Sequence, residues 1–313
     1  MVMQARVRGA GLSLSVTEYG ERGHPTVVLV HGFPDTSAVW VPLAERLAAD
    51  LHVVTYDVRG AGRSDTPASR AGYALQFLME DLAAVIDQTS PDAPVHLVAH
   101  DWGSVQGWEA VITRGLAERF ASFTSISGPP LDHAALWARR HRSLNPRDLR
   151  EVLTQALHSW YIACFRVPLL PELMTRSPGV TTMWAAALHR LEHAQTDGDW
   201  PAATFGADFS HGIELYRANV FGRFRRPVAG STDVPVQLIA PARDRYVTPA
   251  LLDGLEEWTS LMWRRPVDAG HWVIRSNPDG VAVWVREVVA FVEDGVESDG
   301  LRRYRMAPTR PAA

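Results

Sequence analysis

The 313-residue sequence contains no lysine, so all 31 of its basic residues are arginine. Without lysine the chain cannot form a Schiff base with a carbonyl substrate, and that mechanism is excluded. A single cysteine, Cys164, excludes an intrachain disulfide. Its apolar surroundings, WYIACF, favour a buried side chain over a reactive thiol, and the scarcity of cysteine fits a reducing compartment.

Long hydrophobic runs are also missing. No stretch of about 18 uninterrupted apolar residues occurs, and the N-terminal residues lack the sustained apolar core of a secretion signal. We therefore expect a cytoplasmic protein with no transmembrane segment. The formal net charge is −4 and no basic run occurs before the C-terminal tail, so a nucleic-acid partner is not expected.

Short apolar runs alternate with longer amphipathic stretches along the chain. The runs TVVLVH, LHVVTYD, VHLVAH, FTSISG and VPVQLIA, which begin at residues 26, 51, 95, 123 and 234, suit strands of a parallel sheet covered on both faces. The alternating pattern of GLSLSVTEYG predicts a leading antiparallel strand, and MWRRPVD with the helical stretch after it predicts the closing strand and helix. The fold class is α/β, with a mostly parallel twisted sheet and helices on both faces.

The strand rhythm stops near residue 130 and resumes near residue 232, and the intervening residues have a helical pattern rich in Trp, Leu and His. We interpret 130–232 as a helical cap inserted into a core formed by 1–129 and 233–295. Because ligands of open α/β sheets bind outside the carboxyl ends of the strands, the cap is expected to close over that edge. Residues 296–313 are polar and arginine-rich, and predict a flexible tail.

The segment VHLVAHDWGS predicts a strand, a tight turn and a helix with Asp101 at the turn. Small residues, Ala99 and Gly103, stand two positions to either side, as a nucleophile elbow requires. The alternative is that Asp101 only caps the following helix.

Three further segments lie at predicted strand ends. HGFPD follows a strand directly and could bring main-chain N–H groups beside the elbow. ARDRYVTP places Asp244 after the next strand, and AGHWV places His271 after the last one. The chain order of nucleophile, acid and histidine is the order expected when the folded sheet gathers all three.

These motifs, with YDVRGAGRSD, resemble the α/β-hydrolase superfamily in its epoxide hydrolase branch, over nearly the whole chain. A carboxylate that attacks an epoxide leaves an ester, whose carbonyl water can attack, whereas serine would leave an ether. Asp101 would then be the nucleophile, and His271, oriented by Asp244, would activate water. By resemblance, the oxyanion hole is formed by the N–H groups of Phe33 and Trp102.

The resemblance also implies two proton donors in the cap. Related epoxide hydrolases carry one tyrosine at the head of a Tyr-x-x-x-Phe-x-x-Pro run and one before an arginine. YIACFRVP and ELYRANV match these settings and give Tyr161 and Tyr216. A phenol could protonate the alkoxide that forms when the epoxide opens.

Two alternatives concern other side chains. Asp132, which follows the strand at FTSISG, could supply the triad acid in place of Asp244, because some relatives take the acid from that strand's end. HRLEH has the H-x-x-E-H spacing of a zinc peptidase helix, with His189 and His193 one turn apart, but no third ligand is evident.

Two other functions remain open at this stage. A haloalkane or haloacid dehalogenase would use the same nucleophile, although haloalkane enzymes usually have Asn where this chain has Phe33, and fluoroacetate enzymes have Arg where it has Trp102. A non-catalytic binding protein is the third reading. The chain is also similar to the hydrolase half of actinobacterial fusions with a short-chain dehydrogenase. The expected partners are a small hydrophobic epoxide and water, no cofactor or metal is implied, and the sequence leaves a homodimer open.

Overall fold

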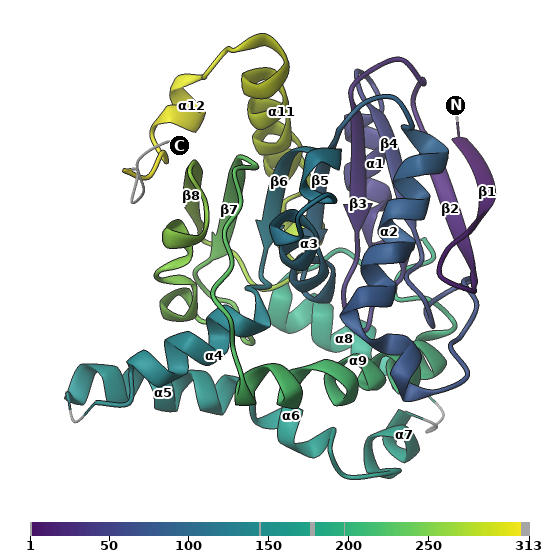
Figure 1. Cartoon of the computed structure of the whole chain (residues 1–313). Helices are drawn as coiled ribbons and strands as arrows, with labels where there is room; N and C mark the ends of the chain where they lie inside the picture. The colour runs from purple at the N-terminus through teal and green to yellow at the C-terminus, as the bar shows by residue number, and fades with distance from the viewer. Residues whose placement is uncertain (1, 144, 176–178, 197, 308–313) are drawn as a thin grey trace.

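A central sheet organises the structure, a computed structural model that describes residues 2–143, 145–175, 179–196 and 198–307 (Figure 1). Within these residues the sheet has eight strands in the order β1-β2-β4-β3-β5-β6-β7-β8. β1 and β2 run antiparallel to their neighbours, and the remaining pairs are parallel. The strands are β1 (Val2–Arg8), β2 (Ser13–Tyr19), β3 (Thr26–Val30), β4 (His52–Tyr56), β5 (Val95–His100), β6 (Phe120–Ile126), β7 (Val236–Pro241) and β8 (Met262–Val267).

The expected α/β fold is confirmed, and burial explains which strands the sequence reveals. Every residue of β3, β4, β5 and β7 is buried, which accounts for their uninterrupted apolar runs. In β2 partly exposed and buried residues alternate, as the sequence predicts. The exposed edge strand β1 was not anticipated, because only Val7 on it is buried.

Helices cover both faces of the sheet (Figure 1). α2 (Leu75–Thr89) and α3 (Trp102–Ile112) pack on one face through residues such as Leu82 and Trp108. α1 (Val41–Leu47), the short α10 (Val273–Ser276) and α11 (Pro278–Asp294) pack on the other, where Leu43 and Val285 belong to one cluster. The two clusters together form the core of the α/β unit.

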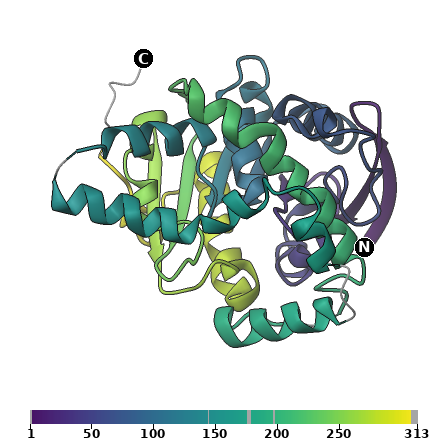
Figure 2. The ribbon, with the colours of Figure 1, turned by 90° about the horizontal axis from the view of Figure 1, so that it is seen from below.

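The chain between β6 and β7 folds into helices that lie across the carboxyl ends of the strands (Figures 1 and 2). Within this helical region α5 and α6 are separated at Ser159, and Cys164, expected to be buried, is partly exposed. The cap helices are α4 (Leu131–Arg140), α5 (Pro146–His158), α6 (Trp160–Cys164), α7 (Leu170–Thr175), α8 (Val180–Glu192) and α9 (Phe205–Arg225).

The expectation of a flexible tail over 296–313 is wrong for the part that follows α11. α12 (Asp299–Arg302) buries Leu301 completely against Trp263 and Val288. The main-chain N–H of Arg264 donates to the carbonyl of Tyr304 at 2.8 Å, which ties this segment to β8. Apolar burial and main-chain pairing thus outweigh the polar composition, while residues 308–313 lie outside the described part of the chain.

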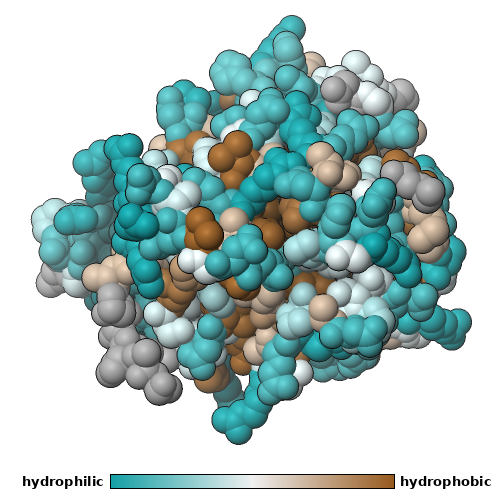
Figure 3. Space-filling view, turned by 90° about the horizontal axis from the view of Figure 1, so that it is seen from above, coloured by the Kyte–Doolittle hydropathy of each residue, from teal (hydrophilic) through white to brown (hydrophobic). Residues whose placement is uncertain are grey.

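The face opposite the cap is mostly hydrophilic, with apolar side chains interspersed (Figure 3). Among the described residues, none of the helices combines the length and the apolar character that crossing a membrane requires.

Candidate active site

Asp101 stands at a strained turn between β5 and α3. Its φ of 53° and ψ of −122° lie in a region that L-residues rarely adopt. The neighbouring chain comes very close: a Cβ on Gly103 would lie 2.2 Å from the Val30 carbonyl oxygen, and one on Gly128 would lie 2.2 Å from that of Asp101. Only small residues allow this approach, so the elbow predicted from the sequence has its steric basis here.

Main-chain donors face the Asp101 carboxylate. The N–H of Phe33 donates to Oδ1 at 2.7 Å, and the N–H of Trp102 faces the same group. Burial raises the pKa of Asp101, while the charge of His271 and these two donors oppose that rise. Asp101 occupies the N-cap position of α3 but makes no capping hydrogen bond, so the capping alternative does not account for its side chain.

His271 lies between two carboxylates. Its Nδ1 is 2.9 Å from Oδ2 of Asp244, and its Nε2 is 3.7 Å from Oδ2 of Asp101. The N–H groups of Tyr246 and Val247 also donate to Asp244, at 2.8 and 3.0 Å, and fix that carboxylate. The structure therefore brings together the nucleophile, acid and histidine that the sequence places at three separate strand ends.

The charge on His271 follows from these neighbours. Burial lowers its pKa, but Asp244, Asp101 and a further carboxylate outweigh burial and raise the pKa to about 9. For Asp244, burial raises the pKa. The charge of His271 and the hydrogen bonds from His271 and the two main-chain donors outweigh burial and lower the pKa of Asp244 below its ordinary value. At neutral pH His271 is therefore an imidazolium in the resting site, with the side chains of Asp101 and Asp244 on either side.

Tyr161 of α6 and Tyr216 of α9 meet above the elbow. Their ring centroids are 5.9 Å apart, and the Tyr216 ring packs edge-on against Trp102 at 4.8 Å. Burial raises the pKa of both phenols, and the Asp101 carboxylate raises each further. Both hydroxyls are accordingly protonated at neutral pH and act as hydrogen-bond donors rather than bases.

Aromatic rings line the region around these tyrosines. The Phe33 ring contacts the rings of Phe165, Phe209 and Tyr216, with centroids 5.5, 4.8 and 5.3 Å away. Phe33 therefore presents its N–H to Asp101 and its ring to the cap. The surroundings of the carboxylate are strongly apolar.

Sequence reasoning missed two buried carboxylates beside the site. Asp35, the last residue of HGFPD, is buried and accepts the indole N–H groups of Trp200 and Trp272 at 2.8 and 2.9 Å. Burial raises its pKa to about 6 against these two donors. Glu192 of α8 is also buried, and its Oε2 accepts the main-chain N–H of His271 at 2.7 Å. Neither contact has a signal in sequence spacing, because each joins the core to a distant cap segment.

Two further residues pack against the His271 ring. His100 lies with its ring centroid 4.6 Å away, and its Nε2 is 3.0 Å from the His271 carbonyl oxygen. The Tyr246 ring lies at 4.7 Å and also contacts Tyr161. The sequence does offer a signal for Tyr246, because it stands two residues after the predicted triad acid Asp244 in ARDRYVTP.

The structure places the two alternative motifs elsewhere. Asp132 forms an ion pair with Arg223 at 2.6 Å and accepts the N–H of Val228, so it serves the packing of α4 against α9. In HRLEH, His189 and His193 are exposed whereas Glu192 is buried. Within the described residues no three metal-binding side chains gather into a site.

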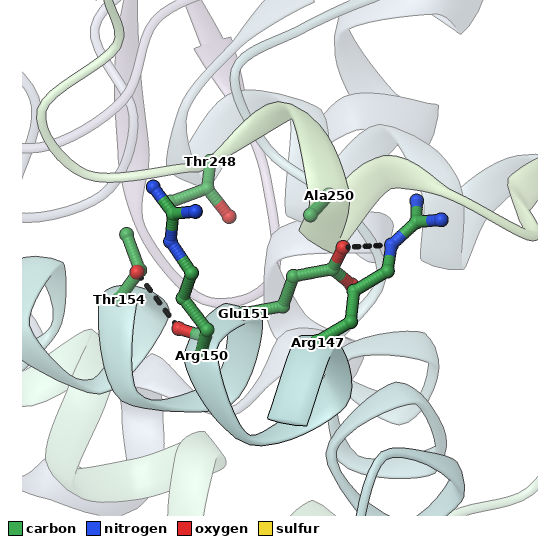
Figure 4. A pocket seen from close by; sticks show the side chains of 6 residues that line it. All are labelled: Arg147, Arg150, Glu151, Thr154, Thr248 and Ala250. Atoms are coloured by element: carbon green, nitrogen blue, oxygen red, sulfur yellow. Dashed lines mark hydrogen bonds and ion pairs between the residues drawn. The ribbon is translucent and has the colours of Figure 1, made fainter. Parts of the chain in front are cut away.

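A hollow of about 440 Å³ lies on the outside of the cap, where α5 meets the short η4 helix (Pro249–Leu252) (Figure 4). Arg147 and Glu151, one turn apart on α5, form an ion pair of 3.0 Å at its wall. Its lining residues are Arg147, Arg150, Glu151, Thr154, Thr248 and Ala250, which do not include the triad residues or the two tyrosines.

Comparison with known proteins agrees with this geometry. Residues 25–278 match the family described as alpha/beta hydrolase fold. The chain is 38% identical over 326 residues to epoxide hydrolase A of Mycobacterium tuberculosis, and the match covers 90% of this chain and 96% of that relative. The chain belongs to the α/β-hydrolase family, in its epoxide hydrolase branch.

A longer relative and a solved structure are also similar to this chain. The probable oxidoreductase EphD of M. tuberculosis is 36% identical over 308 residues, which cover 96% of this α/β-hydrolase but only 51% of EphD. The chain thus spans about half the length of that relative. An epoxide hydrolase of Bacillus megaterium, solved with an inhibitor, has a TM-score of 0.75 at 22% identity and covers 91% of this chain and 99% of its own, which shows the common fold.

Proposed function

We propose that this protein hydrolyses a hydrophobic epoxide to a vicinal diol through an ester on Asp101. The observation that carries the proposal is the set of groups around one carboxylate. Asp101 has main-chain donors on one oxygen, an imidazole near the other, and two protonated phenols in the apolar cap above it. Nucleophile, water base and proton donors are all present within one buried region.

In the first step a carboxylate oxygen of Asp101 attacks an epoxide carbon. The new C–O bond to Asp101 forms as the ring C–O bond breaks, and the leaving oxygen takes a proton from Tyr161 or Tyr216. Because the carboxylate is already ionised, this step needs no base, which is consistent with a protonated His271.

In the second step water attacks the carbonyl carbon of the Asp101 ester. Ester formation removes the charge of Asp101, one of the groups that raise the pKa of His271, so the imidazole releases its proton more easily in the ester than in the resting enzyme. That proton returns to the phenolate that the first step leaves on Tyr161 or Tyr216, and His271 becomes a neutral base. His271 then takes a proton from water, and the oxyanion is held by the N–H groups of Phe33 and Trp102. The intermediate then collapses by breaking the bond between the carbonyl carbon and the alkyl oxygen, which takes the proton of the newly added hydroxyl. The diol leaves, and Asp101 is again a carboxylate beside a protonated His271.

The phenols distinguish epoxides from alkyl halides. A departing halide needs no proton, whereas the alkoxide from an epoxide does, and Tyr161 and Tyr216 are buried donors beside the nucleophile. The Phe33 side chain offers only a ring to the cap and no amide to hold a halide. The aromatic lining favours a hydrophobic epoxide.

Intact-protein mass spectrometry of His271→Ala tests the proposal. Incubation with a hydrophobic aryl epoxide should add the whole mass of the epoxide, and peptide mapping should locate it on Asp101, because the ester forms but is not hydrolysed. Asp101→Ala under the same conditions is the control and should gain nothing. A mass gain from a matched alkyl halide alone, with loss of the halide, would establish a dehalogenase instead, and no adduct from either would exclude Asp101 as nucleophile for both classes.

The cytoplasmic location remains a prediction from the sequence, and the sequence leaves a homodimer open. Small-angle scattering of the purified protein would decide the second, since one and two copies of a 34.6-kDa chain differ twofold in mass.

A further inference from the structure

α8 ends on a glutamate that turns inward. Glu192 is the last residue of the helix, and His193 after it takes a left-handed φ of 52°. The side chain of Glu192 is only 4% exposed, although helix C-termini disfavour negative charge and burial raises the pKa of this carboxyl. A carboxylate in so unfavourable a place calls for a compensating contact.

That contact is the main chain of His271. Oε2 of Glu192 accepts its N–H at 2.7 Å, and a Cβ on Gly270 would lie 2.1 Å from the same oxygen. The residue before the histidine is therefore glycine because the cap carboxylate occupies the space of a side chain. Arg245, 57% exposed, approaches the other oxygen of Glu192 at 3.5 Å.

His271 is consequently fixed at every polar group except Nε2. Asp244 holds Nδ1, Glu192 accepts the main-chain N–H, and His100 Nε2 lies 3.0 Å from the carbonyl oxygen. Burial brings the pKa of His100 well below its ordinary value, so His100 is neutral and donates from Nε2. Nε2 of His271, which faces Asp101, is thus left for water.

The chain after Glu192 makes a second contact with the core, at the short helix α10 that follows His271. The carbonyl of Gln195 accepts from Nε of Arg275 at 2.9 Å, and the Arg275 guanidinium lies 4.7 Å above the Trp200 ring. Trp200 in turn donates to Asp35, which also binds Trp272. The end of α8 cannot shift without breaking contacts on both sides of His271.

We propose that Glu192 is a positioning residue, through which the cap holds the main chain of the water-activating histidine in place. The inference rests on the proposed function, since it assigns a role within the hydrolysis of the Asp101 ester. Glu192 acts only through His271 and does not touch the reacting atoms, so it affects the second step and leaves the attack of Asp101 on the epoxide unchanged.

Glu192 also adds negative charge near the imidazole, and together with Asp244 it remains charged once Asp101 is esterified. The titratable groups that face His271 from the elements packed against it are Asp35, His100, Asp101, Glu192, Asp244 and Tyr246. Removing the charge of Glu192 lowers the pKa of His271. Because ester hydrolysis speeds up as His271 loses its proton, the midpoint of the rate increase then moves to lower pH.

The test compares Glu192→Ala and Glu192→Gln with Leu191→Ala, a neighbour that is 53% exposed. Rapid quenching and mass spectrometry measure formation and hydrolysis of the Asp101 ester separately in a single turnover with an aryl epoxide. For Glu192→Ala we expect hydrolysis to slow about 10- to 100-fold, as for other small displacements of a catalytic group, while ester formation matches Leu191→Ala. Glu192→Gln keeps an acceptor for the N–H, so it should restore most of the rate with its pH profile moved to lower pH.

Hydrolysis in Glu192→Ala at the Leu191→Ala rate, with an unchanged pH profile, would overturn the proposal, and so would an equal loss in ester formation and hydrolysis. Titration of the His271 imidazole by NMR in the resting protein needs no substrate. If wild type forms no ester, the proposed function fails. The titration then still tests the Glu192 contact: a lower His271 pKa in Glu192→Gln than in Leu191→Ala supports it, and an equal pKa contradicts it.

Discussion

At the scale of single residues, the site depends on charges that only the folded protein brings together. Asp101 lies more than a hundred positions before Asp244 and His271 in sequence, yet His271 lies within hydrogen-bonding or ion-pair distance of both carboxylates. An imidazolium with a pKa of about 9 cannot be the base in the resting enzyme. In the proposed mechanism, esterification of Asp101 both forms the intermediate and prepares His271 to activate the water that hydrolyses it.

Asp244→Asn tests the triad acid at this scale. The variant removes the nearest carboxylate that raises the pKa of His271, so the pKa falls and the base limb of ester hydrolysis moves to lower pH. Because an amide nitrogen facing Nδ1 favours the wrong tautomer, we expect kcat to fall by about 10²- to 10⁴-fold, the range known for triad acids in other hydrolases. Stopped-flow measurements across pH provide the check.

Asp132→Asn is the matched control, because Asp132 was the other candidate for the triad acid. Its partner is Arg223, so the substitution should lower thermal stability while kcat stays within about threefold of wild type, as a residue without catalytic contact implies. A loss of kcat in Asp132→Asn as large as in Asp244→Asn would reverse the assignment.

The sequence pattern predicted the site residues that follow strand ends, but it missed the two buried carboxylates whose contacts join the cap to the site. Asp101, Asp244 and His271 share one rule, since the carboxyl ends of parallel strands meet at one edge. Glu192 lies on a cap helix and obeys no such rule, and Asp35 follows β3 but is held by Trp200 of the cap. Their roles arise from where the cap sits, which depends on tertiary packing that periodicity does not encode.

At the scale of elements, α9 brings the cap onto Phe33, whose N–H belongs to the proposed oxyanion hole. A Cβ on Gly212 would lie 2.5 Å from Cδ2 of Phe33, so the helix contacts that ring only because position 212 lacks a side chain. Gly222, ten residues further along α9, has open space around it and a φ outside the left-handed region. Gly212 is thus required for a close contact, whereas Gly222 of the same helix is not.

Gly212→Ala and Gly222→Ala form a matched pair. Each substitution gains about 0.5–1 kcal/mol of helix propensity. At 222 this gain should appear as higher stability with unchanged kcat. At 212 it is offset by the displacement of Phe33, and ester formation and hydrolysis should both slow because the N–H of Phe33 faces the carboxylate in each step. Chemical denaturation and single-turnover rates measure the two effects, and equal kinetics in both variants would contradict the role given to Gly212.

The whole molecule joins cap and core at the loops that carry the triad. Gln155 of α5 accepts the N–H of Thr248 at 2.9 Å and donates to the carbonyl of Tyr246, just after Asp244. Glu192 of α8 accepts the N–H of His271. Each loop that supplies a triad partner is therefore held from the cap, whereas the elbow of Asp101 is held by core glycines. In the proposed mechanism the nucleophile therefore belongs to the core, and the geometry of water activation depends on the cap.

The opposite end of the molecule should contribute stability without affecting this chemistry. Leu301 of α12 is fully buried against Trp263 and Val288, and its segment pairs with the edge strand β8, far from the cap (Figure 1). Leu301→Ala should lower the free energy of unfolding by about 2–4 kcal/mol, as large-to-small core substitutions do. Val296→Ala, at an exposed position of the same segment, is the control and should change stability by less than about 0.5 kcal/mol. Urea denaturation measures both, and single-turnover rates at 25 °C should equal wild type; an unfolding free energy unchanged in Leu301→Ala would return residues 299–306 to the flexible tail that their composition predicts.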